Sequence, residues 1–305
     1  MDRIERKAYG KINLGLDVLG RREDGYHLLK MVMQTVDIAD TVVIEKMSAA
    51  TGTDPIEIIV LAEPGNAKKA EMVSRQVPAG SDNLIYKAAA RMMEAYSLKD
   101  PIRITLTKRI PIAAGMAGGS TDAAAVFLGL RDLFGLSAAD RELQELALPL
   151  GADIPYCIEG GTKLSEGIGE ILTPLPTPPE CGLVIVKPDL FVQTGWVYKT
   201  LDGLDAPKHP DVDGLVCAIR AQDLEQMAAF CGNILECVTA PEYPVIKELE
   251  QFLLDRGALQ AKMTGSGPTV FGIYRDLQEA ETALEALGKV PEFAALEQFA
   301  VRMIG

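Results

Sequence analysis

The sequence is poor in histidine and in basic residues, and the shortage of positive charge argues against two classes of partner. Its 305 residues include 30 Lys and Arg against 43 Asp and Glu, so the formal net charge is −13 at pH 7. A general binder of nucleic acid or of anionic membranes needs a basic face, which this balance disfavours. We therefore expect neither a nucleic-acid nor a membrane partner. A small polyanionic substrate stays compatible with the charge, because one pocket can be positive in an acidic protein.

Cysteine pairs and long apolar runs are also missing. The cysteines are Cys157, Cys181, Cys217, Cys231 and Cys237, an odd number without a C-x-x-C pair, and the only histidines are His27 and His209. This set disfavours a structural zinc site, so we expect no protein-held metal. Scattered thiols, a charged N-terminus and the lack of a run that could span a bilayer predict a cytoplasmic protein.

Alternation of apolar and polar residues predicts strands in the first half of the chain. The predicted strands cover residues 12–18, 31–37, 41–45, 56–61 and 102–106. Residues 63–80 mix Pro, Gly, Ala and charge, which indicates a surface excursion with room for a short helix. Asp82 is a candidate N-cap for a helix up to Tyr96, and an alanine-rich helix ends at Gly135. Ser137 with Asp140 resembles a capping box for a further helix that ends near Gly151.

The second half predicts a different arrangement of elements. A buried strand is expected at 183–186, helices at 215–238, 245–256 and 277–287, and short strands at 260–264, 269–274 and 298–303. This order predicts a split βαβ, ferredoxin-like domain. With the boundary placed near Glu159-Gly160-Gly161, we predict an α+β protein with a mixed α/β domain over residues 1–159 and a ferredoxin-like domain over residues 160–305.

A glycine-rich segment lies between a predicted strand and a predicted helix. It runs Pro-Ile-Ala-Ala-Gly-Met-Ala-Gly-Gly-Ser-Thr-Asp over residues 111–122. Its glycines permit positive φ and close approach of a ligand, and the free N–H groups at a helix start favour phosphate. No Gly-Lys-Ser/Thr ends the segment and G-x-G-x-x-G does not fit it, so neither a Walker A loop nor a dinucleotide loop is predicted. The alternative is a helix start whose glycines serve only packing.

The pattern Pro-x-x-Ala-Gly-x-x-Gly-Gly-Ser-Thr-Asp-Ala-Ala resembles the second motif of the GHMP kinases, which phosphorylate galactose, homoserine, mevalonate and related metabolites. Four further segments resemble one branch of this superfamily, whose members act on a cytidine-diphosphate-linked alcohol. They are Ala-Tyr-Gly-Lys-Ile-Asn-Leu at 8–14, Asp-Gly-Tyr-His at 24–27, Gly-Ala-Asp-Ile-Pro at 151–155 and Met-Thr-Gly-Ser-Gly at 263–267. The resemblance implies a two-domain GHMP fold, ATP as donor, Mg²⁺ delivered with ATP, a small cytidine diphosphate-linked substrate, and a monomer or homodimer.

The resemblance also implies roles for individual residues. Lys11 and Asp153 are implied as catalytic, Lys11 beside the transferred phosphoryl group and Asp153 as the base or the group that orients the acceptor hydroxyl. The residues implied in ATP binding are Pro111, Ile112, Ala113, Ala114, Gly115, Met116, Ala117, Gly118, Gly119, Ser120 and Thr121, with Asn83 and Lys108 near the nucleotide. Those implied in substrate binding are Asn13, Tyr26, His27, Thr194, Tyr198, Gly265 and Ser266, with Gly267 in the same turn.

Each role has a plainer alternative. Lys11 could be a solvated lysine on a strand and Asp153 an ordinary turn residue. Tyr26 is expected to stack on the cytosine ring, and Trp196 and Phe191 compete with Tyr198 for its second face. Two features depart from the usual motif, Thr121 for serine and Ala117 for glycine. As a whole, the chain could instead be a homoserine or mevalonate type kinase, or an inactive metabolite sensor on this fold.

Overall fold

The computed structural model describes residues 2–48, 54–65 and 67–305, and it divides into two compact units. Unit 1 comprises the chain up to Gly10, Ile38–Ile112 and Ala117–Glu159, and unit 2 comprises Lys11–Asp37, Ala113–Met116 and Gly160–Gly305. The last passage between the units, from Glu159 to Gly160, lies at the predicted boundary. Two earlier segments, Lys11–Asp37 and Ala113–Met116, nevertheless belong to unit 2.

Two long strands contribute to both units. They are β1 (Arg3–Arg21) and β2 (His27–Lys46). The prediction of two strands at 31–37 and 41–45 was wrong, because β2 continues through both segments. In unit 1, the first part of β1 lies beside the end of β2, with a backbone hydrogen bond of 2.8 Å from the N–H of Lys46 to the carbonyl of Asp2.

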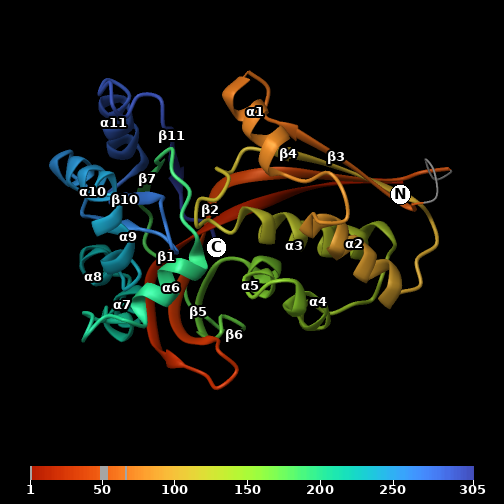
Figure 1. Ribbon diagram of the computed structural model, residues 1–305, viewed down its shortest axis with the longest axis horizontal. Coiled ribbons are helices and arrows are strands. Elements are labelled where there is room, and N and C mark those ends of the chain that lie inside the picture. Colours follow the sequence, from red (N-terminus) through yellow and green to blue (C-terminus); the bar gives the residue numbers. More distant parts are fainter. Residues whose placement is uncertain (1, 49–53, 66) are drawn as a thin grey trace. The chain divides into compact units, whose positions relative to one another are not determined.

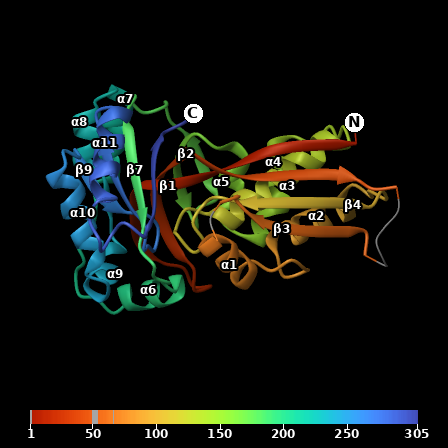
Figure 2. The same cartoon turned by 90° about the horizontal axis from the view of Figure 1, so that it is seen from above.

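The sheet of unit 1 is completed by β3 (Ile56–Ala62) and β4 (Ile102–Lys108) (Figure 2). The strand order is β3-β4-β2-β1, with β3 parallel and β2 antiparallel to β4. Alternation explains this sheet, because every second residue of β4 is buried and the residues between are half-buried.

Helices α2 (Leu84–Ala95) and α3 (Gly118–Leu133) cover the buried face of this sheet. Helix α4 (Asp140–Ala147), the 3-10 helix η1 (Leu148–Leu150) and α5 (Ile154–Glu159) pack against α2 and α3. Helix α1 (Ala67–Gln76) lies apart from them, against β3. Helices α2 and α3 lie side by side (Figure 1), and their apolar residues form one core with Ile44, Ile104 and Leu106 from the strands. The excursion at 63–80 contains the expected short helix, α1, while its residue 66 lies outside the described residues.

Two predicted helix caps were wrong. The N-cap of α2 is Asn83 rather than Asp82, and its side chain accepts a 3.0 Å hydrogen bond from the N–H of Ile85. Helix α4 begins after Ala139, which has no side-chain cap, so Ser137 and Asp140 form no capping box. In both cases the residue types were suitable for a cap, but the backbone enters the helix one or two residues later than the sequence pattern suggests.

Unit 2 contains the predicted ferredoxin-like domain. Its antiparallel sheet has the order β11-β7-β10-β9. The strands are β7 (Gly182–Lys187), β9 (Gln260–Met263), β10 (Val270–Tyr274) and β11 (Glu297–Arg302). Helices α10 (Val245–Asp255) and α11 (Leu277–Leu287) lie against it (Figures 1 and 2). All of β7 and β10 is buried, as expected for the two central strands.

The remainder of unit 2 contains elements that the sequence pattern did not resolve. They are β5 (Thr162–Gly167), β6 (Ile171–Pro174), β8 (Gly232–Asn233), α6 (Thr194–Leu201), α7 (Val212–Ala221), α8 (Leu224–Phe230) and α9 (Glu236–Glu242). The single helical region predicted at 215–238 was wrong. Gln222 adopts a left-handed conformation after α7, Asp223 caps α8, and β8 then pairs with β1 at Gly15 and Leu16.

Candidate active site

The glycine-rich segment ends in the first turn of α3, as predicted. Ala117, just before the helix, adopts a left-handed conformation with φ of 57°. The first backbone hydrogen bond of the helix runs from the N–H of Thr121 to the carbonyl of Ala117. Gly118, Gly119 and Ser120 precede that bond, so their N–H groups have no acceptor within the helix. This arrangement is typical of an anion-binding helix start.

The hydroxyls of the segment lie in different surroundings. Thr121 Oγ1 donates a 2.6 Å hydrogen bond to the carbonyl of Tyr9 in β1, so this side chain fastens the helix to the strand. Ser120 lies close to the Gly-Ala-Asp segment, since a Cβ built on Gly151 would be 4.0 Å from Ser120 Oγ. Asp153 is two residues further on, directly before α5. Unit 1 therefore brings the start of α3 and the candidate acid into one region.

In unit 2, Lys11 and Asn13 lie together on β1. Lys11 Nζ donates a 2.8 Å hydrogen bond to Asn13 Oδ1, and both residues are buried, at 5% and 1% exposure. Burial excludes the plain alternative of a solvated lysine. The Lys11 N–H donates to the carbonyl of Met116 over 3.2 Å, and the Asn13 N–H donates to Thr264 Oγ1 over 2.9 Å. The strand thus contacts both the glycine-rich segment and the Met-Thr-Gly-Ser-Gly segment at 263–267, here called the third motif.

The third motif packs directly on the glycine-rich segment. A Cβ on Gly115 would lie 2.6 Å from the carbonyl oxygen of Thr264, and one on Gly265 would lie 3.0 Å from the carbonyl oxygen of Gly115. Both glycines also have positive φ, 71° and 59°. No side chain fits at these two positions, so glycine is required by space as well as by backbone conformation.

An open pocket of about 440 Å³ adjoins this contact. Its lining residues are Ala113, Gly115, Phe191, Val192, Gln193, Thr194, Gly195, Trp196, Ser266 and Gly267. Thr194 Oγ1 and Ser266 Oγ lie 2.9 Å apart within it. Two predicted substrate residues and part of the predicted phosphate loop therefore share one cavity.

The predicted base-binding residues gather around His27. Tyr26 is 60% exposed, with its ring available for a ligand. The His27 ring stacks on Tyr198, with centroids 4.7 Å apart and planes at 29°, and its Nε2 lies 2.7 Å from Asp202 Oδ1. Trp196 instead makes an edge contact with Tyr243, at 6.5 Å between centroids. Of the three candidate partners for Tyr26, Tyr198 is the one in ring contact with its neighbour His27.

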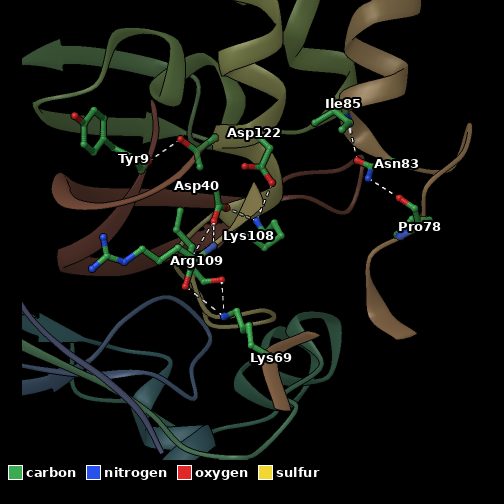
Figure 3. A network of polar contacts seen from close by, with 11 residues as sticks. Tyr9, Asp40, Lys69, Pro78, Asn83, Ile85, Lys108, Arg109 and Asp122 are labelled. Carbon is green, nitrogen blue, oxygen red and sulfur yellow. Dashed lines mark hydrogen bonds and ion pairs between the residues drawn. The ribbon is translucent and has the colours of Figure 1, made fainter. Parts of the chain in front are cut away.

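The two residues predicted near the nucleotide have partners within unit 1 (Figure 3). Asn83 Nδ2 donates a 2.6 Å hydrogen bond to the carbonyl of Pro78, besides the cap made by its Oδ1. Lys108 is 4% exposed, and its ammonium contacts the carboxyl groups of Asp40 and Asp122. Lys108 is therefore buried, and the alternative of an exposed lysine at a strand end is wrong.

Sequence reasoning missed Asp40 and Asp202, and it gave no separate role to Thr264, although the motif at 263–267 contains that residue. The sequence did contain a signal for Asp40, because this residue lies on the same side of its strand as Ile38, Val42 and Ile44, which all face the core. A carboxylate in a buried phase needs partners, and this could have singled it out. Thr264 and Asp202 contact residues far away in the sequence, at Asn13 and His27, so no local pattern indicates these contacts.

The described ranges, 2–48, 54–65 and 67–305, contain no group of three or more His, Cys, Asp or Glu side chains that could hold a metal ion. None of their helices combines the length and apolar character needed to cross a membrane.

Comparison with known proteins identifies the family. The family model for the GHMP kinases N terminal domain matches residues 83–161, and that for the GHMP kinases C terminal matches residues 215–292. A relative from Lachnospira eligens, named 4-diphosphocytidyl-2-C-methyl-D-erythritol kinase, is 46% identical over 91% of each chain. One of the same name from Acetivibrio thermocellus is 44% identical over 94% of this chain and 95% of its own. The chain belongs to the GHMP kinase family, which confirms the predicted resemblance.

Solved structures agree with this assignment. A crystal structure of a 4-(cytidine 5′-diphospho)-2C-methyl-D-erythritol kinase matches with a TM-score of 0.79 and 32% identity, over 99% of this chain and 100% of that one. A homoserine kinase from Cytophaga hutchinsonii also reaches 0.79, at 19% identity, over 100% of this chain and 95% of that one. At such low identity the second match shows the fold alone, and it confirms the predicted two-domain GHMP architecture.

Proposed function

We propose that this protein transfers the γ-phosphoryl group of ATP to the 2-hydroxyl of 4-diphosphocytidyl-2-C-methyl-D-erythritol. The observation that carries the proposal is the set of contacts around Lys11 in unit 2. This buried lysine contacts Asn13, its strand hydrogen-bonds the glycine-rich segment, and the same strand hydrogen-bonds Thr264. One cation, one amide and two glycine turns are thereby held together, an arrangement that suits phosphoryl transfer to a bound alcohol. The names of relatives at 46% and 44% identity support the choice of acceptor.

The proposed roles follow from the chemistry of each group. The N–H groups at the start of α3 bind the ATP phosphates, and the Lys11 ammonium offsets the charge that develops on the transferred group. Asp153 accepts the proton of the acceptor hydroxyl or orients that hydroxyl for in-line attack. Since phosphoryl transfer has a loose transition state, positioning supplies most of the catalysis.

We further propose that Tyr26 and Tyr198 hold the cytosine ring between them, while Asn13, Thr194 and Ser266 bind the polar groups of the acceptor. Tyr26 is exposed and free to rotate onto a base, and Tyr198 already contacts the ring of His27. Stacking on aromatic rings is a common way to bind a nucleobase.

Magnesium fits this site as a companion of ATP. The described residues offer no cluster of metal ligands, whereas Ser120 and the phosphate oxygens would together suit a hydrated Mg²⁺. When bound, the ion would screen the phosphate charge. The five cysteines are all free, in keeping with the reducing cytoplasm where we place the reaction.

A substrate panel with ATP and Mg²⁺ tests the proposal. The wild-type protein should phosphorylate the cytidyl substrate and should not phosphorylate homoserine or mevalonate. Asp153→Asn and Lys11→Met should each lower kcat by roughly 10²- to 10⁴-fold. Asp205→Asn, a change at an exposed turn, is the matched control and should keep wild-type kcat.

Two results would overturn the assignment. Turnover of homoserine or mevalonate without turnover of the cytidyl substrate would assign the protein to another branch of the family. Binding of ATP and the cytidyl substrate with no turnover in the wild type would instead support a metabolite sensor.

A further inference from the structure

Three ionisable side chains from separate elements of unit 1 meet beneath the first turn of α3 (Figure 3). Asp40 comes from β2, Lys108 from the last position of β4, and Asp122 from the helix itself. Their side chains are 0%, 5% and 4% exposed. A Cβ on Gly118 would lie 3.4 Å from Lys108 Nζ, so the ammonium also lies against the first helical residue after the glycine-rich segment.

The two carboxyl groups have unequal sets of partners. Asp40 accepts from the Lys108 ammonium with one oxygen and from the N–H groups of Arg109 and Ile110 with the other, the latter at 2.8 Å. Asp122 accepts from Lys108 over 2.8 Å with Oδ2, while its Oδ1 has no hydrogen-bond partner among the described residues. A fully ionised carboxylate with one bare buried oxygen would be costly, and this cost falls on Asp122 alone.

The pKa shifts also distinguish Asp122 from Asp40. Burial raises the pKa of Asp122 well above its usual range, and the neighbouring Asp40 adds to this effect, while Lys108 opposes it. Burial by itself would lower the pKa of Lys108, but the carboxyl groups of Asp122 and Asp40 more than offset it, so this pKa is raised. Lys108 and Asp40, whose two oxygens both accept hydrogen bonds, are therefore the charged pair.

We propose that Lys108, Asp40 and Asp122 form a clamp without net charge that positions the glycine-rich segment, with Lys108 and Asp40 ionised and Asp122 carrying a proton. The proposal rests on the proposed use of ATP, because its purpose is to hold the helix start that binds phosphate. Lys108 is then a positioning residue: it acts through Asp122 and through its packing against Gly118.

The proton on Asp122 has a consequence for anion binding. If all three groups were ionised, the clamp would carry one negative charge in the first turn of α3. A buried carboxylate there would occupy the positive end of the helix dipole and repel the phosphates of ATP. A neutral Asp122 leaves that end of the helix available to the nucleotide.

Matched variants separate this clamp from a direct nucleotide contact. Asp122→Asn keeps the shape and the neutral charge, so it should leave the KM for ATP within about threefold of the wild type. Asp40→Asn removes the charged partner of Lys108 and should raise the KM for ATP by about tenfold or more. Lys108→Met should do the same, yet add little in the Asp40→Asn background, because both changes break one unit. Additive effects would mean that Lys108 contacts ATP itself, and would overturn the clamp.

Infrared spectroscopy detects the proton without any turnover. At pH 7 the wild type should show protonated-carboxyl absorption, part of which belongs to Glu250, since burial raises the pKa of that residue to about 7. In the Glu250→Gln background the remaining band should be lost on adding Asp122→Asn and kept on adding Asp153→Asn. A band that Asp122→Asn leaves unchanged contradicts the proposal. Because this readout needs no substrate, it stands even if the proposed kinase reaction fails, and a missing band would leave that reaction untouched.

The pH dependence of unfolding gives a second, independent measure. Asp122 keeps its proton in the folded chain above pH 3.8, the value at which the unfolded chain loses it. Its contribution to stability is therefore full below that pH, declines as pH rises above it, and is lost once pH passes the raised pKa of the folded state. Asp122→Asn abolishes this decline, so urea unfolding at pH 5, 6 and 7 should show the variant gaining on the wild type as pH rises. A constant ratio would overturn the neutral clamp.

Discussion

At the scale of single residues, Ala117 is held in a conformation that suits glycine. Its φ of 57° costs an L-residue about 1 kcal/mol, and it precedes α3 without any side-chain cap. Ala117→Gly should therefore raise the free energy of unfolding by about 1 kcal/mol and the Tm by about 2 °C. The same change at Ala90, within α2, should lower stability by about 1 kcal/mol, because the backbone there is helical. Thermal denaturation compares the two, and a loss at Ala117 would show that the strain is absent.

Removal of the Tyr198 ring should weaken binding of the acceptor substrate and leave binding of ATP unchanged. Stacking on a base contributes about 1–3 kcal/mol, so Tyr198→Ala should raise the KM for the cytidyl substrate roughly 5- to 100-fold and leave that for ATP unchanged. Tyr198→Phe keeps the ring and should stay within about threefold of the wild type. The same kinetics tests the rival residues. If Trp196→Ala or Phe191→Ala raises the KM for the cytidyl substrate more than Tyr198→Ala does, that residue forms the second face of the base site.

The sequence predicted these residues unevenly, for a physical reason. Lys11 and Asp153 were found through motifs, since chemistry constrains their type and spacing. The burial of Lys108 was not expected, because a lysine at a strand end is usually solvated and its partner Asp40 lies 68 residues away. The available signal was an aspartate among the alternating apolar positions of a strand. It indicates that the carboxyl group has a partner, but not which residue that partner is.

At the scale of elements, the third motif adjoins a pair of buried carboxyl groups, those of Glu236 and Glu250. Glu236 on α9 accepts a 3.1 Å hydrogen bond from the N–H of Met263, the first residue of the motif. Lys247 contacts both Glu236 and Glu250, and Lys262 Nζ lies 3.6 Å from Glu236 Oε1. Burial opposes a low pKa at Glu236, yet its partners lower it, while burial and the nearby Glu236 raise the pKa of Glu250 to about 7.

This pair predicts a pH dependence of stability. Because the pKa of Glu250 is raised in the folded state, this residue contributes fully to stability below about pH 4.5, the usual pKa of a glutamate. The contribution is lost as pH rises through about 7, its pKa in the folded state. Glu250→Gln removes that loss, so the stability of the variant relative to the wild type should improve from pH 5 to pH 8. Urea midpoints at both pH values measure it, with the exposed Glu248→Gln as control on the same helix. Equal shifts for both variants would contradict the coupled pair.

Elements with a strong period were predictable, and short ones were not. Helix α11 occupies the predicted residues 277–287, since its apolar face repeats with helical spacing and Asp276 caps it. The region 215–238 has the same spacing, but Gln222 and β8 interrupt it. What stops the helix there is pairing of β8 with β1 more than 200 residues earlier, a tertiary contact that local propensity does not contain.

At the scale of the whole molecule, neither unit is a continuous stretch of chain. The chain passes between the units after Gly10, Asp37, Ile112, Met116 and Glu159. A change of composition near residue 160 indicates only the last of these passages. The others lie inside strands β1 and β2 or inside the glycine-rich segment, where the local pattern continues without a break.

This interleaving predicts how the fragment Gly160–Gly305 behaves alone. Its sheet β11-β7-β10-β9 is complete, whereas β5 has lost its partner residues Leu29–Gln34 in β2 and keeps only β6, and β8 has lost β1. Hydrogen exchange should therefore show amide protection retained in β7 and β10, reduced in β5 and lost in β8, since strands that have lost a partner exchange by local opening. Adding a fragment of residues 1–159 should restore protection in β5. If β5 in the isolated fragment is as protected as in the intact chain, the second half of the chain folds without Lys11–Asp37, and that segment contributes only chemistry to unit 2.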